Sequence, residues 1–395
     1  MISNVSIKNF KSVVDVSLPL GRFNLLIGAN GCGKSNILEG IALGAAASSN
    51  KLDYEYFANR GMRVTDPQFM LPAFVEVNAD NISIDAIDEK AAGFSCKLHY
   101  NDERKPPKWE DDSFSISQYF SFVRQNLPKN KEDVVKLQKL LNQIESLEKE
   151  RGEKTLLNIR LQRKADDITI VPNIDEMKSF LIYSLEESKL RQPDNSIRTY
   201  PLGRHGEGLF SYLKDLAQRP DSSQMFEEIK EHLKILDWFD DLEVPTGQLS
   251  MEFDLKLKDS YLAETLNIFD QRSTNEGFLY LLFYFTLVIS DETPRFFAIE
   301  NIDTAFNPKL CREVIKKLVE LAKKHGKQII ATTHNPAVLD GLDLNDDEQK
   351  LMVVQRSIDG YTKVRTLKKE EVVNSDLSLS QLWLRGFIGG LPNNF

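Results

Sequence analysis

The sequence predicts an α/β fold, and three observations support this prediction. Alternating apolar residues near the N-terminus lead into a glycine-rich loop at 28–33, and a helical pattern follows at once. Later in the chain, two short apolar strands at 295–299 and 328–332 flank an amphipathic segment at 310–325. Strands that alternate with helices in this way are typical of a parallel sheet covered by helices.

Length and composition describe an ordinary folded protein. The chain has 395 residues, of which 41% are hydrophobic and 28% are charged. This length corresponds to roughly two to three domains and allows a large buried core. The composition excludes a largely disordered chain, a collagen-like chain and a coiled-coil rod. Three widely spaced cysteines form neither a disulfide framework nor a paired zinc motif, and they suit a reducing, cytoplasmic compartment.

Charge and hydropathy limit the classes of partner. The N-terminus shows no apolar signal segment, and the longest apolar run, at 278–289, is too short to span a bilayer. The formal net charge of −9 argues against a broadly basic nucleic-acid-binding protein, although a local basic groove is compatible with it. We therefore expect a cytoplasmic protein that has no membrane partner.

The first hundred residues are predicted to form a lobe of strands with one helix. Apolar alternation over 4–27 indicates two or three strands, and the spacing of apolar residues after residue 33 indicates a helix. Further strands are expected at 73–78 and 94–100. The last of the early strands runs directly into the glycine-rich loop.

Residues 101–200 have a different character. They are charged and poor in glycine, and apolar residues recur at three- and four-residue steps within 137–147 and 177–185. Such spacing places one apolar stripe along each helix. We therefore interpret 101–200 as a helical insertion between the two lobes.

Residues 201–372 are predicted to form the second lobe, and residues 373–395 form a C-terminal tail. The patterns in this lobe indicate two helices within 209–238, a strand at 249–257, a helix that begins near residue 276, and closing strands at 350–354 and 361–366. The tail carries Trp383 and Phe387 among glycines. We expect the tail to pack against its own core, with docking of a partner protein as the alternative.

The strongest chemical signal lies in the glycine-rich loop. Residues 28–35 read GANGCGKS and match the phosphate-loop pattern G-x-x-x-x-G-K-[ST] between a predicted strand and a predicted helix. Glycines allow backbone N–H groups to point at phosphate oxygens, and the helix N-terminus adds its positive dipole end. Lys34 would reach the β- and γ-phosphates, and the Ser35 hydroxyl would be a ligand for Mg²⁺. The motif therefore predicts a site for ATP and Mg²⁺.

Two further apolar strands end in residues suited to phosphate chemistry. The strand at 296–299 precedes Glu300, as in strands whose terminal acid orders the Mg²⁺ shell. The strand at 329–332 precedes Thr333 and His334, so a histidine reaches the edge where open α/β sheets bind ligands. The order of these motifs predicts Glu300 as a metal ligand and His334 as a γ-phosphate sensor.

At this point a resemblance to a known family becomes specific. Residues 7–12, IKNFKS, followed by the phosphate loop, resemble the beginning of the SMC/RecF-like ABC ATPases. The chain is more similar still to smaller stand-alone ATPases related to the overcoming-lysogenisation-defect (OLD) family. The resemblance covers both ends of the chain and implies an ABC-type P-loop ATPase head. It implies nucleotide contacts from Lys11, Ser12, Asn30, Gly31, Gly33, Lys34, Ser35 and Asn36.

The same resemblance assigns a role to the helix near residue 276. Asn275, Glu276 and Gly277 take the place of the ABC signature, and the family implies that this helix N-terminus binds the γ-phosphate of the opposite protomer. The usual serine is absent unless Ser273 substitutes for it. A simple helix cap at Asn275 is the alternative. The signature interpretation implies a homodimer, or a higher homo-oligomer, that closes around ATP.

One position departs from the family pattern. Relatives usually carry two acids after this strand, one for Mg²⁺ and one that orients or deprotonates the attacking water. Here Glu300 takes the metal position and Asn301 takes the catalytic position, where an amide cannot act as a general base. Asp303 is a candidate for partial compensation, and Glu300 is the base if the alignment shifts by one residue. We expect slow hydrolysis, or ATP that serves mainly as a clamp.

Weaker features have structural alternatives. Basic residues cluster within 316–327 and at 160–164, where contacts to DNA phosphates compete with the simpler interpretation of solvated helix faces. Arg204 and His205 lie in a glycine-rich loop that either contacts the nucleotide or an interface, or forms a plain turn.

Three functions remain open from the sequence. The first is an ATPase of a prokaryotic anti-phage defence system that controls a separate effector, a nuclease or a toxin, because no nuclease, Toprim or protease motif follows His334. The second is a RecF-like DNA-maintenance ATPase stimulated by duplex DNA, against which the acidic net charge argues. The third is a nucleotide-gated binding module with negligible hydrolysis, which Asn301 favours.

Overall fold

The computed structural model divides the chain into two compact units, each assembled from separate stretches of sequence. Unit one contains residues 1–20, 35–180 and 356–364, and unit two contains residues 21–34, 181–355 and 365–395. The chain passes from unit two to unit one between Lys34 and Ser35, inside the phosphate loop. The residues that the structure describes are 1–74, 77, 79–89, 93–103, 108–111, 113–115, 159–164, 167–172, 175–192, 201–219, 222–244, 255–263, 268–270, 272–372 and 377–391.

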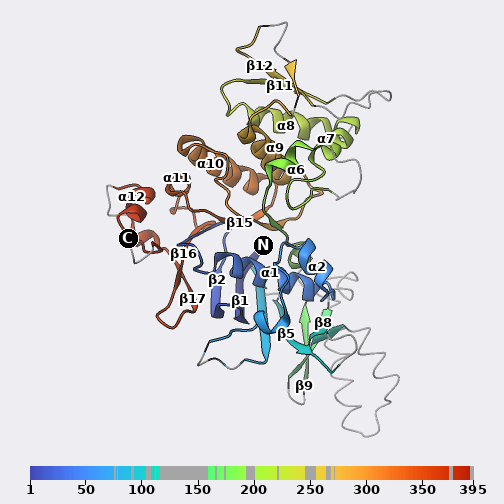
Figure 1. Cartoon of the computed structure of the whole chain (residues 1–395), viewed down its shortest axis with the longest axis vertical. Helices are drawn as coiled ribbons and strands as arrows, with labels where there is room; N and C mark the ends of the chain where they lie inside the picture. The colour runs from blue at the N-terminus through green and yellow to red at the C-terminus, as the bar shows by residue number, and fades with distance from the viewer. Residues whose placement is uncertain are drawn as a thin grey trace. The chain divides into compact units, whose positions relative to one another are not determined.

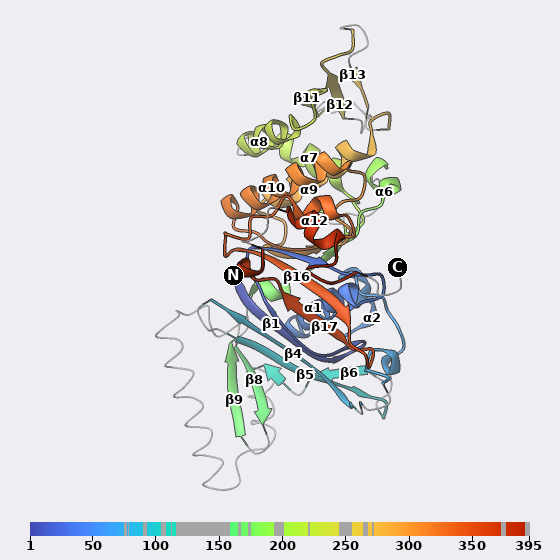
Figure 2. The same cartoon turned by 90° about the vertical axis from the view of Figure 1, so that its left-hand side faces the viewer.

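Unit one is built on an antiparallel sheet. Its strands lie in the order β2 (Val13–Pro19), β1 (Ile2–Phe10), β4 (Asn81–Asp88), β5 (Gly93–Asn101) and β6 (Lys108–Asp111), and Figure 2 shows β1, β4, β5 and β6 side by side. The unit also holds α2 (Tyr54–Asn59) and η1 (Pro67–Phe69). Alternation correctly predicts β1, β2 and β5. The strand expected at 73–78 is wrong for its described residues 73, 74 and 77, and β4 follows instead.

Helix α1 (Lys34–Ser48) confirms the helix predicted after the glycine-rich loop, and two glycines let it approach the sheet of unit one. A Cβ placed on Gly40 would lie 2.9 Å from Ile7 Cδ1, and one on Gly44 would lie 2.8 Å from Ile84 Cγ2. Larger side chains at these two positions would push the helix away. The sheet and helix thus share one apolar interface.

The described residues of 101–200 are mainly extended, which corrects the helical interpretation for them. β7 (Ser113–Ser115), β8 (Ile159–Lys164) and β9 (Asp167–Pro172) form an antiparallel sheet. The segment 177–185 divides between α5 (Asp175–Lys178) and β10 (Ile182–Tyr183). It is not one helix, because β10 pairs with a strand at 296–299. The apolar residues Met177 and Phe180 are buried. The helix predicted at 137–147 lies outside the described residues. The four-part division of the chain stays a prediction.

The main sheet of the molecule is six-stranded, and its strands from β10 to β16 are parallel. The order is β10, β14 (Phe296–Ile299), β15 (Gln328–Thr332), β3 (Phe23–Ile27), β16 (Gln349–Arg356) and β17 (Thr362–Thr366). Each of these strands except the short β10 was predicted within a residue or two. This agreement confirms the α/β fold class.

Helices and a small sheet complete unit two, as Figure 1 shows. The helices are α6 (Glu187–Arg191), α7 (Leu209–Gln218), α8 (Ser223–Leu233), α9 (Glu276–Ile289), α10 (Pro308–Lys324), α11 (Pro336–Leu339), η4 (Lys369–Glu371) and α12 (Leu379–Leu384). The small sheet contains β11 (Phe239–Glu243), β12 (Lys256–Asp259) and β13 (Ile268–Phe269). The strand predicted at 249–257 overlaps β12, and its first six residues lie outside the described part of the chain.

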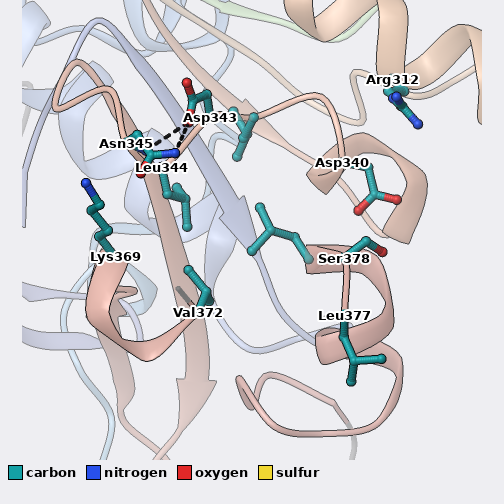
Figure 3. Close-up of a pocket in the computed structure, with 11 residues that line it drawn as sticks. Arg312, Asp340, Asp343, Leu344, Asn345, Lys369, Val372, Leu377 and Ser378 are labelled. Atoms are coloured by element: carbon teal, nitrogen blue, oxygen red, sulfur yellow. Dashed lines mark hydrogen bonds between the residues drawn. The ribbon is translucent and has the colours of Figure 1, made fainter. Parts of the chain in front are cut away.

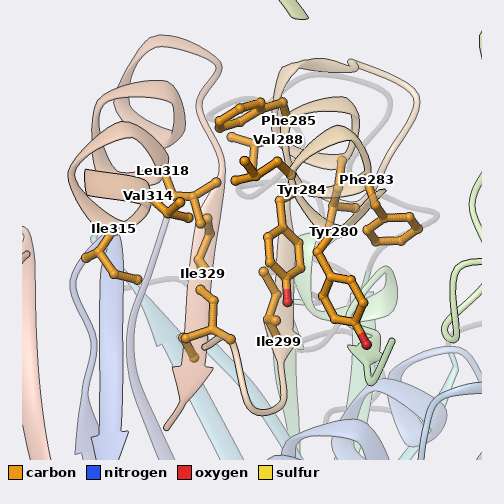
Figure 4. Packing of buried hydrophobic residues seen from close by; sticks show 14 of the residues in the cluster. Tyr280, Phe283, Tyr284, Phe285, Val288, Ile299, Val314, Ile315, Leu318 and Ile329 are labelled. Carbon is orange, nitrogen blue, oxygen red and sulfur yellow. The ribbon is translucent and has the colours of Figure 1, made fainter. Parts of the chain in front are cut away.

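Helix α9 is the centre of the hydrophobic core of unit two. All residues from Phe278 to Ile289 are buried. Figure 4 shows Tyr284 and Val288 of α9 facing Val314 of α10 and Ile299 of β14. This burial on every side explains the long apolar run, as expected for a core helix. Among the described residues, no helix combines the length and apolarity that a membrane crossing needs.

Candidate nucleotide-binding site

The glycine-rich loop leaves the carboxyl end of a buried central strand. β3 lies between β15 and β16, and all five of its residues are buried. In the loop that follows, Gly28, Gly31 and Gly33 have φ angles of 152°, 74° and 110°, which L side chains rarely adopt. A Cβ on Gly28 would also lie only 2.1 Å from the carbonyl oxygen of Val354. The loop therefore needs glycine at these positions in order to turn tightly before α1.

Lys34 begins α1, and its side chain folds back over the loop. The Nζ donates to the carbonyl oxygens of Gly28 at 2.8 Å and Ala29 at 3.1 Å. Burial lowers the pKa of Lys34, while the nearby Cys32 thiol and the Glu300 carboxylate act in the opposite direction. The ammonium group thus sits over the loop whose backbone the motif assigns to phosphate oxygens.

Parallel strands deliver the other predicted groups to the same edge of the sheet. Ile299 pairs with Ala331 in register, and Ala331 pairs with Leu25. The segments that follow these strands therefore leave the sheet together. Glu300 follows β14 directly and His334 follows β15, and both interact electrostatically with Lys34. The structure brings these three predicted residues together.

His334 is an exposed residue at this edge, and neighbouring groups cover only part of its side chain. Burial lowers the pKa of His334, the Lys34 ammonium lowers it further, and Asp303 acts in the opposite direction. A histidine with a pKa below its usual value of about 6.5 is neutral at physiological pH. A neutral imidazole can donate one hydrogen bond to a phosphate oxygen and still accept another from a neighbour.

Thr333 connects the loop after β15 with the loop after β14. Its hydroxyl donates to Asp303 Oδ1 at 2.6 Å and accepts from the backbone N–H of Asn335 at 2.9 Å. A second contact runs from Asn335 Nδ2 to Cys311 Sγ at 3.5 Å, and burial raises the pKa of this thiol to about 11. Thr333 was only part of a motif in the sequence, and its bridging role needed the tertiary structure.

Asn301 has a backbone conformation that suits its side chain. Its φ is 49°, in the left-handed region where asparagine is better tolerated than most residues. Its N–H donates to Thr332 Oγ1 at 3.0 Å, and its carbonyl oxygen accepts from both the N–H and the hydroxyl of Thr304. Asn301 thus begins a tight turn after Glu300, which gives a structural reason for the amide at this position.

A buried ion-pair network in unit one surrounds other predicted residues. The Glu39 carboxylate, which is 3% exposed, pairs with the Lys11 ammonium and with Arg63 Nε at 2.6 Å. Asn36 accepts a hydrogen bond from Arg63 at 2.9 Å and donates one to the Ser12 hydroxyl at 2.7 Å. The network therefore joins Lys11, Ser12 and Asn36. The sequence patterns did not lead us to predict a role for Glu39. An isolated acid within the apolar pattern of α1 could have indicated one.

The start of α9 is a capped helix terminus. Asn275 Oδ1 accepts from the N–H of Phe278 at 2.9 Å, so the capping interpretation of Asn275 is confirmed. A Cβ placed on Gly277 would lie 3.1 Å from the carbonyl oxygen of Ala305. This close approach sets the start of α9 beside the 301–306 loop. Ser273 forms its own turn with Asp270. Binding of a partner's nucleotide at this terminus remains a prediction.

The basic cluster on α10 is paired with acids. Each of four lysines has a carboxylate within 3.3 Å: Lys316 with Glu313, Lys317 with Glu320, Lys323 with Asp346 and Lys324 with Glu228. Lys327 is 1% exposed and donates to the carbonyl oxygens of Ser290 and Thr293. The four pairs match the interpretation of a solvated helix face, whereas that interpretation is wrong for the buried Lys327. For the second cluster, at 160–164, the structure describes the backbone strand β8 but not the side chains.

The loop with Arg204 and His205 has a structural role in unit two. His205 Nδ1 lies 2.8 Å from the Ser184 carbonyl oxygen and 3.2 Å from Glu186 Oε1. Its N–H donates to Glu207 Oε2 at 2.9 Å. These contacts are those of a folded turn packed against the segment after β10.

A cavity of about 440 Å³ lies elsewhere in unit two. Figure 3 shows it between the ends of α11 and α12 and the loop that carries Asp343 and Asn345. Arg312, Asp340 and Lys369 contribute charges to its wall. Its lining contains none of the motif residues, so it is separate from the edge where Lys34, Glu300 and His334 meet.

Comparison with solved structures shows that this fold is a known one. The crystal structure of the SmcHead bound to the C-winged helix domain of ScpA matches with a TM-score of 0.52 and 16% identity, over 95% of this chain and 99% of that chain. An SMC head domain from Thermotoga maritima gives a TM-score of 0.45 at 12% identity over 93% and 99% of the two chains. The Smc head domain from Pyrococcus furiosus bound to the C-terminal domain of ScpA gives 0.49 at 12% identity over 94% and 97%. The first similarity supports the fold of an SMC-like P-loop ATPase head.

Residues 23–340 match a family described as "AAA domain, putative AbiEii toxin, Type IV TA system". The match spans well over half of the chain, and the chain belongs to this family. Its fold is that of an SMC-like P-loop ATPase head. A search among curated proteins finds no significant match.

Proposed function

We propose that the chain binds ATP at the phosphate loop and hydrolyses it slowly. The observation that carries this proposal is the meeting of Lys34, Glu300 and His334 beside a loop of left-handed glycines. Backbone N–H groups and Lys34 would stabilise negative charge on the phosphates, and His334 would contact the γ-phosphate. Further contacts of the nucleotide are assigned to Lys11, Ser12, Asn30, Gly31, Gly33, Ser35 and Asn36.

The donors at this site fit Mg²⁺ as the accompanying metal. The Ser35 hydroxyl and the Glu300 carboxylate are hard oxygen ligands of the kind that Mg²⁺ prefers. Phosphate oxygens and water would complete the shell. When bound, the metal supplies neutralisation of charge on the phosphates. Ser35 and Glu300 would hold it.

Slow turnover follows from the residue at position 301. The amide of Asn301 cannot take a proton from water, so a general-base contribution on the order of a hundredfold or more is absent. Glu300 as the base, or compensation by Asp303, would restore part of it. A nucleotide-gated binding module with negligible hydrolysis is the second candidate, and the left-handed backbone that suits Asn301 favours it.

ATP is proposed to hold two copies of the chain together. The capped N-terminus of α9, at Asn275 and Gly277, would bind the γ-phosphate of the opposite protomer, because a helix terminus offers unpaired N–H groups. Such half-sites make nucleotide binding and dimerisation one equilibrium. A homodimer, or a higher homo-oligomer, is therefore part of the proposal.

The biological role is proposed to be control of a separate effector in prokaryotic anti-phage defence. The family description names a toxin of a type IV toxin–antitoxin system, which fits a defence setting. The resemblance of the sequence to OLD-related stand-alone ATPases supports a cytoplasmic sensor or scaffold for a nuclease or toxin. A DNA-maintenance role is less well supported, since the lysines of α10 are paired with acids.

ATP turnover by the purified chain, with and without duplex DNA, tests the proposal against Lys34→Ala as the blank. We expect slow turnover above the blank that DNA does not change. Several-fold stimulation by DNA would favour the DNA-maintenance function. Turnover at the level of the blank, together with ATP binding that Lys34→Ala abolishes, would favour the nucleotide-gated module. Light scattering with and without MgATP measures dimerisation, which Lys34→Ala should prevent.

A further inference from the structure

The C-terminal segment of the chain lies against the phosphate loop. Gly390 is buried, and a Cβ placed on it would lie 3.5 Å from Gly28 Cα and 2.9 Å from Val353 Cγ1. Gly28 is the first residue of the loop, and Val353 belongs to β16, the strand beside β3. A methyl group at position 390 would therefore press on the Val353 side chain and stand in van der Waals contact with the Cα of Gly28.

Specific contacts hold this segment in place. Trp383 and Ile388 are 4% and 3% exposed, and the carbonyl oxygen of Ile388 accepts a 3.0 Å hydrogen bond from Arg365 Nη2. Gly389 and Gly390 have φ angles of 77° and 80°, so the chain turns sharply as it reaches the loop. Because Trp383 and Ile388 are buried and the backbone turns at the two glycines, the contact between Gly390 and Gly28 is part of the folded structure.

Gly28 is enclosed by the C-terminal segment and by two other groups. Besides Gly390, the carbonyl oxygen of Val354 and the Sγ of Cys32 lie within 2.8 Å of where its Cβ would be. The carbonyl oxygen of Gly28 is itself an acceptor for the Lys34 ammonium, at 2.8 Å. Any shift of Gly28 therefore moves an atom that positions Lys34.

We propose that Trp383, Ile388, Gly389 and Gly390, which we name the C-terminal brace, hold the phosphate loop in its nucleotide-binding shape. These are positioning residues, since they act on the nucleotide through Gly28. The inference rests on the proposed function, because it takes the loop to bind ATP. Coupling of this kind is reciprocal, so nucleotide binding should also change the surroundings of the brace.

Two glycine-to-alanine variants that impose a similar backbone strain test the brace. Gly386 has a φ of 78°, close to that of Gly390, but a Cβ placed on it would meet nothing within 4 Å. Gly386→Ala therefore imposes a similar backbone strain without pressing on Val353, which pairs with Ile27 directly before the loop. We expect Gly390→Ala to raise the Kd for MgATP by about tenfold or more, and Gly386→Ala to change it by less than about twofold. Thermal unfolding of both full-length variants measures their stability.

The fluorescence of Trp383 reports whether nucleotide binding reaches the brace. A purely structural role of the brace would leave this fluorescence unchanged when MgATP binds. The chain has two other tryptophans, Trp109 and Trp238, and replacing both with Phe leaves Trp383 as the only tryptophan, which excitation at about 295 nm selects over the tyrosines. Its indole Nε1 lies 3.6 Å from the Cβ position of Gly390. We expect MgATP to shift the emission of Trp383 in this background. The same shift should be absent when Lys34→Ala is added.

The outcomes separate the brace from the function on which it rests. If the wild-type chain binds no ATP, the proposed function fails and the brace fails with it. If the wild-type chain binds ATP but the two glycine variants lose affinity equally, and Trp383 emission ignores MgATP, only the brace is overturned. If Gly390→Ala does not fold, the Trp383 experiment alone decides, with a nucleotide-dependent shift in support and an unchanged spectrum against.

Discussion

The Thr333 hydroxyl donates a 2.6 Å hydrogen bond to Asp303 and accepts one of 2.9 Å from the N–H of Asn335. One fully buried side chain thereby joins the loops that follow β14 and β15. His334 lies between Thr333 and Asn335 in the sequence, so this link fixes the backbone of the histidine relative to the turn at Asn301. The relation suggests that the two loops move as one.

Thr333→Val removes the link and keeps the shape of the side chain. We expect turnover to fall roughly tenfold to a hundredfold, because His334 and Asp303 lose their mutual position. The affinity for ATP should change much less, since Lys34 and the phosphate loop are untouched. Steady-state kinetics with measured Kd values checks this. Thr333→Ser keeps the hydroxyl and should restore turnover, and equal losses in both variants would contradict the positioning role.

Asn301→Glu supplies the carboxylate that the position lacks. We expect turnover to rise at least about tenfold, less than a full general-base effect, because Glu must adopt a left-handed backbone at a cost of about 1–2 kcal/mol. Asn301→Gln carries nearly the same backbone cost without the charge, and it should not accelerate turnover. A flat rate for Asn301→Glu, measured with saturating MgATP, would mean that the amide does not limit the chemistry.

The pKa of His334 should lie below the ordinary histidine value of about 6.5. Burial is the main cause, and Lys34 adds to it. NMR titration of the imidazole measures this pKa, which Lys34→Met should raise and Asp303→Asn should lower further. As the pH falls through about 6.5, the unfolded chain binds this proton before the folded chain does, so the contribution of His334 to stability is lost on acidification. A pKa above 6.5 would contradict the described surroundings.

Glu39→Leu leaves the nearly buried ammonium of Lys11 without its carboxylate. We expect the free energy of unfolding to fall by about 3 kcal/mol, because breaking a buried ion pair costs about 3–5 kcal/mol and Arg63 can turn to water. Asp15→Asn breaks the exposed Lys8–Asp15 pair, 3.4 Å long, and should cost less than about 1 kcal/mol. Urea unfolding compares the two variants, and similar losses would argue against the importance of burial.

Much of the fold could be predicted because the evidence for it is local. The strand, loop and helix around residues 23–48 follow from apolar periodicity and glycine chemistry, and the structure confirms them. The same holds for β14, α10 and β15, where apolar runs and an amphipathic helix alternate. Local propensity and tertiary packing agree in these segments, so the sequence pattern was sufficient.

Where prediction failed, pairing between distant segments overrode the local pattern. Three- and four-residue apolar spacing at 177–185 suggested a helix, yet β10 pairs with β14, more than a hundred residues away in sequence. Strand β4 begins eight residues after the start of the strand expected at 73–78, because its partners β1 and β5 determine its register. Short apolar patterns do not reveal such partners.

By itself, the sequence determined the chemical groups at the candidate site: a phosphate loop with Lys34, an acid after one strand and a histidine after another. Residue types and short spacings carry this information, since each motif lies within a few consecutive residues. Only the tertiary structure decided which groups meet. It set Glu300 and His334 beside Lys34, joined Thr333 to Asp303, gave Lys11 a buried partner and laid Gly390 on Gly28. These contacts join residues that are 28 to 362 positions apart in the sequence, and they form only when the chain folds.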